Sequence, residues 1–530
     1  MDTVTPVFKD KLFYVLIAVL AASVALKVSF AFDYVTYTDE LLSTFAAESI
    51  SETGKPTLSS GGLYTRAPLA HYLLSIPIGL FGVDLLPIRI GSIFYSLVTA
   101  LLIYILGRRI MRPGLAFVGA AMFSFCSLGN QFALSGRMYM AYAMFFMLTA
   151  CFFQFGYIED RKWAKTLTLL AMVATMLSSE AGLLLGFILF VGLLVHRGPK
   201  VFRERTTYVG LGLWVVGVWF VMGFLADLSL TTFTVHGGTQ PAKIIHLGMG
   251  FREILSDQSY LWRTLDSTLP FSLCFFIPMV ALVILKRDLR QHYPLVILLA
   301  ALLAESLLTY RIQYRIVIAL VPLYYVVCFK LIDTAWSWRS VKQPSQLPRW
   351  SLLLAGSLSV LSLASVLFFA KIRGPSDVAG YLKQAYGFHD ARQDQDPRPS
   401  YTFLASQLEE GDIVVASTLE YALFYLGKEH DFRHLRQKRL DGGFGSFGER
   451  NDPYYGKPIV DDVSVLKETI ESADGTVWIV AGPKADGNVG QPLKEFITDQ
   501  FEIAFDDSAS NSTLVYRLSA NGTKEDPRSP

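Results

Sequence analysis

The sequence contains little charge and little cysteine. Charged residues account for 17% of its 530 residues, whereas soluble domains carry roughly 25%, and hydrophobic residues account for 52%. The four cysteines lie inside apolar runs without CxxC or Cys/His spacing, so we interpret them as buried small hydrophobes rather than metal ligands. No basic block with interleaved aromatic residues occurs, which argues against nucleic acid as a partner. These shortages are typical of an integral membrane protein.

Long apolar runs provide the membrane segments that this composition suggests. Crossing a hydrocarbon core of about 30 Å takes about 20 mainly apolar residues in a helix. The first run follows Lys9 and Lys11, but it is long for a signal peptide and contains Lys27, so we expect an uncleaved helix. We predict about eleven transmembrane helices, at about residues 12–32, 88–107, 113–130, 138–158, 163–179, 181–196, 207–226, 268–285, 293–310, 314–333 and 350–372.

Lysine and arginine residues gather in alternate loops between these runs. The basic loops share a side with Lys9 and Lys11, and they lie near residues 108–112, 161–165, 197–205, 286–290 and 339–349. Basic loops remain in the cytoplasm. The sequence therefore predicts a cytoplasmic N-terminus and, with an odd number of spans, an extracytoplasmic C-terminal region. We expect the membrane to be the plasma membrane of a bacterium or an archaeon.

The residue pattern changes near residue 374. We predict a membrane domain over 1–373, with long external loops at 33–87 and 227–267, and a soluble extracytoplasmic α/β domain over 374–530. No internal repeat is visible in the membrane part, which weighs against an inverted-repeat transporter. In the soluble part we expect strands at 412–417 and 476–481, helices at 420–426 and 463–472, and a hairpin of 501–505 with 513–518.

Two groups of ionisable residues map to the first external loop. Asp39 and Glu40 follow the first membrane helix, where two acids suit a general base or a metal ligand. Asp39 also fits the start of a short helix over 41–50, as its N-cap. Further on, Arg66 suits an anionic head group or a lipid phosphate at the interface, and Tyr64 and His71 flank it. We expect 69–81 to form a helix near the membrane interface.

Further arginines map to the same side of the membrane. Arg137 and Tyr139 open the fourth helix, where an arginine opposes the helix dipole and calls for an anion. Arg311 and Arg315 lie between the ninth and tenth helices and depart from the positive-inside pattern, which favours a bound phosphate or carboxylate. Glu180, before the sixth helix, suits either a helix cap or the wall of a cavity.

Taken in order, these residues resemble the GT-C glycosyltransferases that use a polyprenyl-phosphate-linked sugar. The similarity is greatest to the protein O-mannosyltransferases and the lipid A aminoarabinose transferases, and it covers about residues 10–330. It consists of Asp39-Glu40 after the first helix, a Pro-Leu helix ending in Phe-Gly at 68–82, Arg89 opening the second helix and Arg137-Met-Tyr139 opening the fourth. The family's Arg-Tyr before a Pro-containing helix is present as Tyr314-Arg315, in inverted order.

The resemblance implies roles for these residues. It makes Asp39, with Glu40, the catalytic acids, and it assigns the lipid phosphate to Arg66, Arg137, Tyr139, Arg311 and Arg315. Where relatives carry an acid and a lysine, or His-Pro-Pro, this chain has Thr65-Arg66-Ala67-Pro68, so a divalent cation as cofactor is left open. Glu180 stands where relatives often carry a histidine, and we count it with Tyr64 and His71 as further candidates.

The sequence thus predicts a membrane glycosyltransferase. It would move a hexose or pentose from a polyprenyl-phosphate donor to an acceptor hydroxyl on the external face, with inversion at the anomeric carbon. The acceptor is open among glycans, lipids and proteins. The alternative is a transporter or lipid-carrier flippase with an external sensing domain. That alternative would place ionisable groups at mid-membrane, whereas here they map to the external face.

Overall fold

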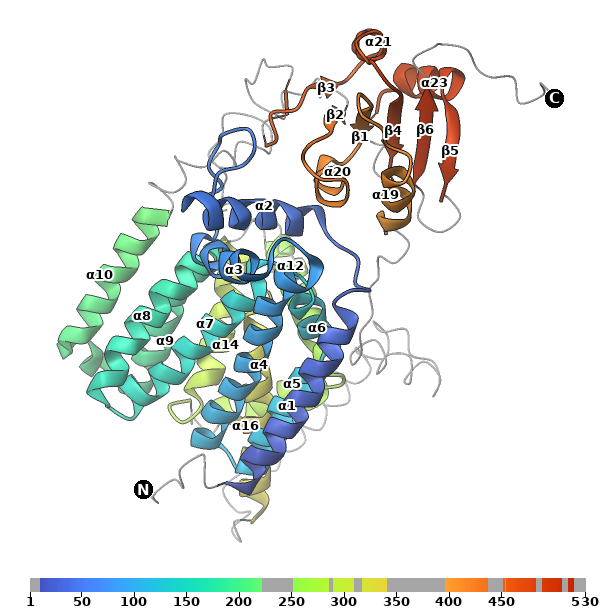
Figure 1. Cartoon of the computed structure of the whole chain (residues 1–530). Coiled ribbons are helices and arrows are strands. Elements are labelled where there is room, and N and C mark those ends of the chain that lie inside the picture. The colour runs from blue at the N-terminus through green and yellow to red at the C-terminus, as the bar shows by residue number, and fades with distance from the viewer. Residues whose placement is uncertain are drawn as a thin grey trace, which may run out of the picture. The chain divides into compact units, whose positions relative to one another are not determined.

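A computed structural model describes residues 10–221, 251–285, 289–308, 317–340, 396–436, 451–452, 454–482, 489–507 and 513–518. The chain divides into two compact units, which we call the membrane unit and the sheet unit. The membrane unit comprises Met1–Phe32, Arg66–Ala226 and Lys243–His389, and the sheet unit comprises Asp33–Thr65, Asp227–Ala242 and Asp390–Pro530. Figure 1 shows the helices of the membrane unit and the strands of the sheet unit.

The described part of the membrane unit is built of helices. Short 3-10 or π segments join several of them, at Gln154–Ile158, Glu180–Leu184 and Gly198–Arg203. The α-helices are α1 (Lys11–Phe30), α3 (Pro68–Phe81), α4 (Leu85–Ile110), α5 (Pro113–Phe125), α6 (Ser127–Ala133), α7 (Met138–Phe153), α8 (Lys162–Ser178), α9 (Leu185–Arg197), α10 (Arg205–Trp219), α12 (Phe251–Thr268), α13 (Leu273–Leu285), α14 (Tyr293–Leu308) and α16 (Leu320–Ser340).

Several of these helices are long and apolar enough to cross a bilayer, so the chain is an integral membrane protein. Among the described residues there are five: Lys11–Phe30, Leu85–Ile110, Met138–Ile158, Glu180–Arg203 and Leu320–Ser337. A sixth exists if Tyr260–Thr268 and Leu273–Ile284, which meet at 114°, are one broken span. The predicted polytopic helical architecture is confirmed, but the count of eleven is not reached within the described ranges. The eleventh predicted span, 350–372, lies outside them.

Two membrane segments differ from the sequence prediction. The run at 113–130 does not form one helix, because the backbone turns out of helical geometry at Cys126 (φ −66°, ψ 138°) between α5 and α6. The predicted loop 227–267 is outside the described residues up to 250, and from there it is the helix α12. Leu261 and Leu265, four residues apart on α12, are fully buried. Polar residues between them concealed this helical spacing from the sequence.

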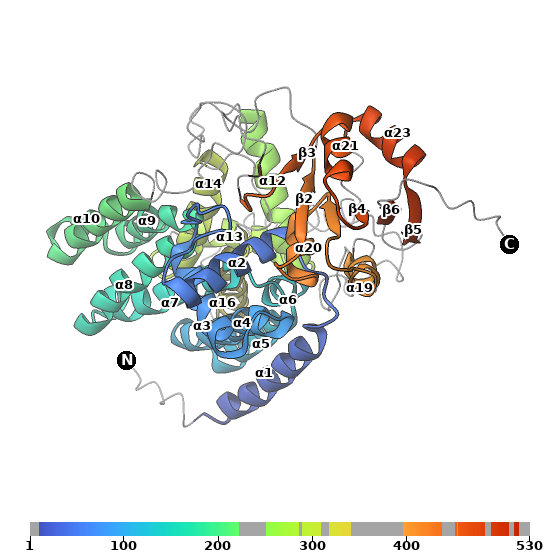
Figure 2. The same cartoon turned by 45° about the horizontal axis from the view of Figure 1, so that its top comes forward.

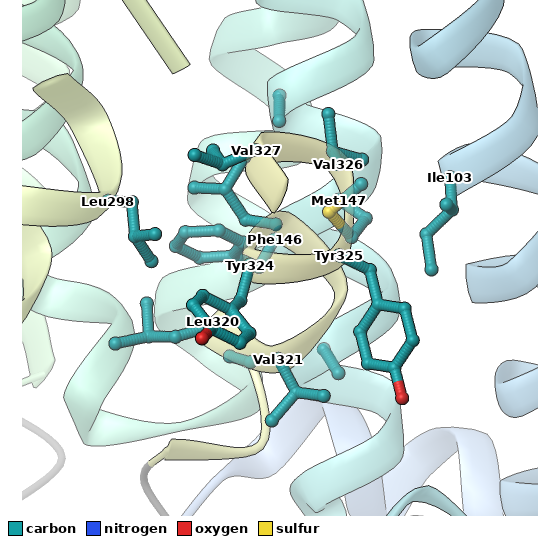
Figure 3. Packing of buried hydrophobic residues seen from close by; sticks show 14 of the residues in the cluster. Ile103, Phe146, Met147, Leu298, Leu320, Val321, Tyr324, Tyr325, Val326 and Val327 are labelled. Atoms are coloured by element: carbon teal, nitrogen blue, oxygen red, sulfur yellow. The ribbon is translucent and has the colours of Figure 1, made fainter. Parts of the chain in front are cut away.

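Helix α16 lies at the centre of the membrane unit. Its residues from Leu320 to Leu331 are almost all buried, so every face of the helix packs against another helix. Figure 3 shows its side chains between Phe146 and Met147 of α7, Leu298 of α14 and Ile103 of α4. The cysteines follow the expectation of buried hydrophobes, since three are buried, Cys274 is partly exposed and none of the four is in a disulfide.

The sheet unit carries a six-stranded sheet in the order β3-β2-β1-β4-β6-β5. The first four pair in parallel, and β6 runs antiparallel to β4 and to β5. The strands are β1 (Ile413–Ala416), β2 (Asp431–Leu435), β3 (Ile459–Val460), β4 (Val477–Ala481), β5 (Glu502–Asp506) and β6 (Leu514–Leu518). The predicted strands at 412–417 and 476–481 and the predicted hairpin are confirmed, whereas β2 and β3 are additional.

Helices cover both faces of this sheet, which explains why β1 is apolar throughout (Figure 2). Val414 and Ala416 of β1 point into a core with one set of helices, and Ile413 and Val415 point into a second core with the other set. The first set is α2 (Thr38–Thr53), α19 (Arg398–Ala405) and α20 (Leu419–Tyr425), and the second is α21 (Val463–Glu471) and α23 (Gln491–Gln500). Helix α2, from the predicted first external loop, thus belongs to the sheet unit.

Candidate active site

A small pocket opens between helices α3, α4 and α7 of the membrane unit. Its walls are contributed by Ala70, His71 and Leu74 of α3, Gly91, Ser92 and Tyr95 of α4, and Gly136, Arg137, Met138 and Ala141 at the start of α7. The consecutive helices α3 and α4 therefore meet the start of α7 around two of the predicted site residues, His71 and Arg137. The pocket is small, with room for about one water-sized molecule.

Arg137 is the N-cap residue of α7 and is only 6% exposed. Its Nη2 atom donates to the hydroxyl of Tyr139 at 3.2 Å, and its guanidinium lies 5.3 Å from the centre of that ring. The N-terminus of a helix carries a partial positive charge, so a guanidinium at this position adds to the positive potential of the pocket wall. The pair that the sequence singled out is therefore held together, with the cation in the wall of the pocket.

His71 faces the same pocket from α3, a helix of 14 residues that is too short to cross a bilayer. Burial and the neighbouring Arg137 cation together lower the pKa of His71 to about 3. The imidazole is therefore neutral at physiological pH. It adds hydrogen-bonding capacity to the pocket without adding a second positive charge.

The turn before α3 is strained. Ala67 has φ 45° and ψ 54°, in the left-handed region that residues other than glycine rarely adopt, and it precedes Pro68, which disfavours helical geometry in that residue. Such a conformation costs about 1–3 kcal/mol and persists where the surrounding structure enforces it. The strain lies between Arg66 and His71, and it fixes the direction in which α3 leaves the Arg66 turn.

Arg66 forms an ion pair with Glu180 of the 3-10 segment before α9. The Nε–Oε1 distance is 2.9 Å, and the two side chains are 48% and 20% exposed. Exposed ion pairs of this kind contribute only about 0–1 kcal/mol. The pair therefore contributes little to the stability of the fold. The structure thus pairs Arg66, the predicted phosphate ligand, with Glu180, for which the sequence allowed either a helix cap or a cavity wall.

The pocket and the basic loops lie at opposite ends of α4. At one end, Arg109 and Arg161 both pair with Glu159, at 3.8 Å and 2.9 Å, in two loops predicted to be cytoplasmic. Gly91, in the pocket wall, precedes Arg109 by roughly 27 Å of helix at 1.5 Å per residue. This separation approaches the thickness of a hydrocarbon core.

Asp39 and Glu40 open α2 in the sheet unit, and the structure gives them different surroundings. Glu40 is fully buried, and its carboxylate accepts from the backbone N–H of Tyr37 at 3.3 Å, as in a capping box. Asp39 is partly exposed, and its backbone carbonyl accepts from the hydroxyl of Ser43 at 3.1 Å. The capping contact that the sequence assigned to Asp39 is thus made by Glu40.

Two acids that the sequence analysis did not single out lie near this end of α2. Burial raises the pKa of Glu420, in the first turn of α20, and the charges of Asp452 and Asp39 raise it further. Asp452 is 2% exposed and accepts from Nδ1 of His434 at 2.8 Å. Burial alone would raise the pKa of Asp452, but the hydrogen bond and charge of His434 and two backbone N–H donors lower it overall. A strand and a loop distant in sequence create this cluster, so no local motif marks it.

Tyrosines surround these acids. Tyr64 is 3% exposed. Burial raises the pKa of Tyr454 to about 12, and electrostatic interactions with Tyr64, Asp452 and Glu420 contribute to the increase. The backbone N–H of Ser60 donates to the carbonyl of Tyr454 at 3.1 Å, which joins the hairpin at 57–63 to this loop. Tyr64 therefore belongs to the sheet-unit cluster with Asp39 rather than to the arginine pocket of the membrane unit.

Arg311 and Arg315 lie outside the described residues, so their predicted contact with phosphate stays a prediction. Within the described ranges, no group of three His, Cys, Asp or Glu side chains is arranged to hold a metal ion. The turn at Thr65-Arg66-Ala67-Pro68 offers no carboxylate of its own. The residues present there do not fit a divalent cation, and we assign no step to one.

Comparisons with known proteins agree with this architecture. The family described as dolichyl-phosphate-mannose-protein mannosyltransferase matches residues 65–223. No curated protein sequence matches the chain. The crystal structure of ArnT from Cupriavidus metallidurans in the apo state is similar, with a TM-score of 0.58 and 13% identity over 95% of this chain and 98% of that chain. The structure of the same protein bound to undecaprenyl phosphate is also similar. Its TM-score is 0.56, with 13% identity over 95% of this chain and 97% of that chain.

The apo oligosaccharyltransferase of Archaeoglobus fulgidus also matches, with a TM-score of 0.47 and 12% identity over 89% of this chain and 70% of that chain. At 13% identity, the similarity to ArnT shows the fold. The matched family segment contains α3, α4 and α7, and therefore the pocket with Arg137 and His71. The chain is thus similar to the dolichyl-phosphate-mannose family over residues 65–223 and to ArnT in its fold.

Proposed function

We propose that this chain is a membrane glycosyltransferase that moves a sugar from a polyprenyl-phosphate carrier to an acceptor hydroxyl on the external face of the membrane. The observation that carries this proposal is the buried Arg137 in the pocket of α3, α4 and α7. That pocket falls in the segment that matches the dolichyl-phosphate-mannose family. The structure of ArnT with undecaprenyl phosphate bound supports a carrier of the same chemical class.

In this proposal the arginines bind the carrier. Arg137 and Arg66 donate hydrogen bonds to the phosphate, together with Arg311 and Arg315, and the hydroxyl of Tyr139 helps to hold the Arg137 guanidinium. A phosphate gains negative charge as it leaves the anomeric carbon, so positioned cations stabilise the transition state as well as the bound donor. The neutral His71 contributes a hydrogen bond in the same pocket.

Asp39 acts on the acceptor. Its carboxylate takes the proton from the acceptor hydroxyl, whose oxygen forms a bond to the anomeric carbon. The bond from that carbon to the phosphate oxygen breaks, and the phosphate departs with the electron pair. A single displacement inverts the anomeric centre and needs no carboxylate nucleophile, in contrast to retaining glycosidases. Glu40, which caps α2, positions Asp39.

The alternative of a flippase or transporter makes a different prediction. A flippase would move the lipid-linked sugar intact, whereas a transferase separates the sugar from its carrier. The full-length protein in liposomes, given a polyprenyl-phosphate sugar with a radiolabelled sugar, should release free polyprenyl phosphate and label the acceptor. Movement of intact donor across the bilayer without release of the carrier would contradict the proposal. Mass spectrometry of glycolipids and surface glycans from cells lacking the protein identifies the acceptor.

A further inference from the structure

Glu420 and Tyr455 belong to a polar cluster in the sheet unit that the mechanism above leaves unused. Glu420 lies in the first turn of α20, and Tyr455 lies in the loop anchored by Asp452, which accepts from the Tyr455 backbone N–H at 3.0 Å. Electrostatic coupling joins the Tyr455 phenol to the Glu420 carboxylate, and it joins Glu420 to Asp39. Glu420 therefore lies close enough to Asp39, the residue that we propose as the base, for their charges to interact.

The packing of α2 on α20 explains this proximity. Leu41 and Phe45 of α2 share a buried core with Leu419 and Leu423 of α20. Just before α2, the carbonyl of Thr36 accepts from the hydroxyl of Tyr421 on α20 at 2.9 Å. These contacts hold the first turns of the two helices close together, each with its acid.

The Tyr455 hydroxyl gives the cluster an independent mark of a ligand site. Tyr455 is 3% exposed, and its ring packs edge-on against Phe45 with the centroids 6.0 Å apart. Its hydroxyl is buried and has no hydrogen-bond partner among the described residues. A buried hydroxyl without a partner is unfavourable in the folded protein, and native structures retain few of them. A ligand oxygen that accepts a hydrogen bond from the Tyr455 hydroxyl would remove this unfavourable contribution to the free energy.

We propose that Glu420 and Tyr455, together with Asp39, bind the acceptor, and that the acceptor is a neutral compound rich in hydroxyl groups. This inference rests on the glycosyl transfer proposed above. The Glu420 carboxyl group accepts from one ligand hydroxyl, and the Tyr455 hydroxyl donates to a ligand oxygen. The neighbouring Tyr454, which is half-buried, supplies an aromatic face for the apolar C–H edge of a sugar ring.

The charges at this cluster select against an anionic acceptor. The charges of Asp452 and Asp39 raise the pKa of Glu420, whereas His434 lowers it, and the Arg436 cation acts on the neighbouring Tyr454. A phosphate bound here would bring further negative charge beside these acids. The site therefore fits a glycan hydroxyl better than a phosphorylated lipid head group.

The test uses the full-length protein in lipid nanodiscs and two matched probes. Methyl α-mannoside is the neutral probe, mannose 6-phosphate is the anionic one, and calorimetry gives the Kd of each. We expect the wild type to prefer methyl α-mannoside. Tyr455→Phe and Glu420→Gln should each raise its Kd roughly tenfold, while the KM for the lipid-linked donor stays unchanged. Matched controls are Glu409→Gln at an exposed site and Tyr516→Phe in the core on the opposite sheet face.

A merely structural role predicts a different result for Tyr455→Phe. Because the lost hydroxyl has no partner among the described residues, the substitution would leave both Tm and the Kd unchanged. An unchanged Kd in Tyr455→Phe would overturn the inference. So would a wild type that does not bind methyl α-mannoside, or one that binds mannose 6-phosphate equally well. Loss of transfer in Asp39→Asn alongside any of these outcomes would leave the proposed function standing. Transfer at the wild-type rate in Asp39→Asn would overturn the proposed function instead.

Discussion

Replacing Arg137 tests the donor half of the proposal. Arg137 is 6% exposed in the wall of the pocket, so a phosphate that it contacts is largely shielded from water. One hydrogen bond between charged groups in such a site contributes about 1.5–3 kcal/mol, and its loss corresponds to roughly a 10–150-fold weaker affinity. We expect Arg137→Ala to weaken binding of undecaprenyl phosphate by this factor and to slow turnover as well, because the arginine acts on ground state and transition state alike.

The Tm of Arg137→Ala, measured beside the affinity, reports whether the fold survives the substitution. Arg137 interacts with the hydroxyl and ring of Tyr139, and cation–π contacts contribute about 0.5–2 kcal/mol. Arg137→Lys keeps the charge but not the planar fork, so its loss should be smaller than that of alanine. Arg161→Ala, in a predicted cytoplasmic loop, is the control. Affinities measured in nanodiscs that differ by less than about threefold between wild type and Arg137→Ala would refute the reasoning.

Three further predictions concern the rest of the chain. Lys27 donates to the hydroxyl of Ser23 and to the carbonyl of Ser124 at 2.8 Å each, so Ser23→Ala should destabilise the protein by about 1–3 kcal/mol, and adding Lys27→Met should recover part of the loss of Tm. Folding lowers the pKa of Asp452, so the ionised carboxylate stabilises the folded protein at pH values above its ordinary pKa of 3.8. This contribution is lost as the pH falls through the lowered pKa. Asp452→Asn should flatten that acid limb of Tm against pH. A cysteine at exposed Glu410 should react with an impermeant maleimide in intact cells if the sheet unit is extracytoplasmic, and labelling only after lysis would contradict that orientation.

Hydrophobic pattern predicted most of the fold. The runs at 12–32, 88–107 and 138–158 became α1, α4 and α7 with its π-helical extension, because unbroken apolar sequence of that length has few other stable solutions. In the sheet unit, the buried strands β1 and β4 were equally plain. The strand β2 (DFRHL) was missed, because its polar residues give no alternation or apolar run. The break at Cys126 was missed too, since residues 123–128 contain neither glycine nor proline to mark it.

The candidate site was only partly predictable. Arg137 with Tyr139 was visible as a motif at a helix start, and the structure holds the two in contact. The pairing of Arg66 with Glu180 joins residues 114 apart in sequence, so only the folded chain reveals it. Glu420 lies in an ordinary helix start, and its meaning depends on α2 packing against α20. Residue types indicated chemistry here, whereas tertiary packing decided which side chains meet.

The most direct test of the central claim is the transfer rate of Asp39→Asn. The substitution keeps the size of the side chain and removes the basic oxygen, and loss of a general base lowers rates by about 10²–10⁴-fold. The helix cap should persist, because Glu40 makes it. Purified wild type and Asp39→Asn are given the same polyprenyl-phosphate sugar and the acceptor identified from the deletion strain. Our account predicts a loss of at least about a hundredfold with unchanged Tm. Transfer within about threefold of wild type would contradict it, because asparagine keeps the shape of aspartate but cannot act as the general base.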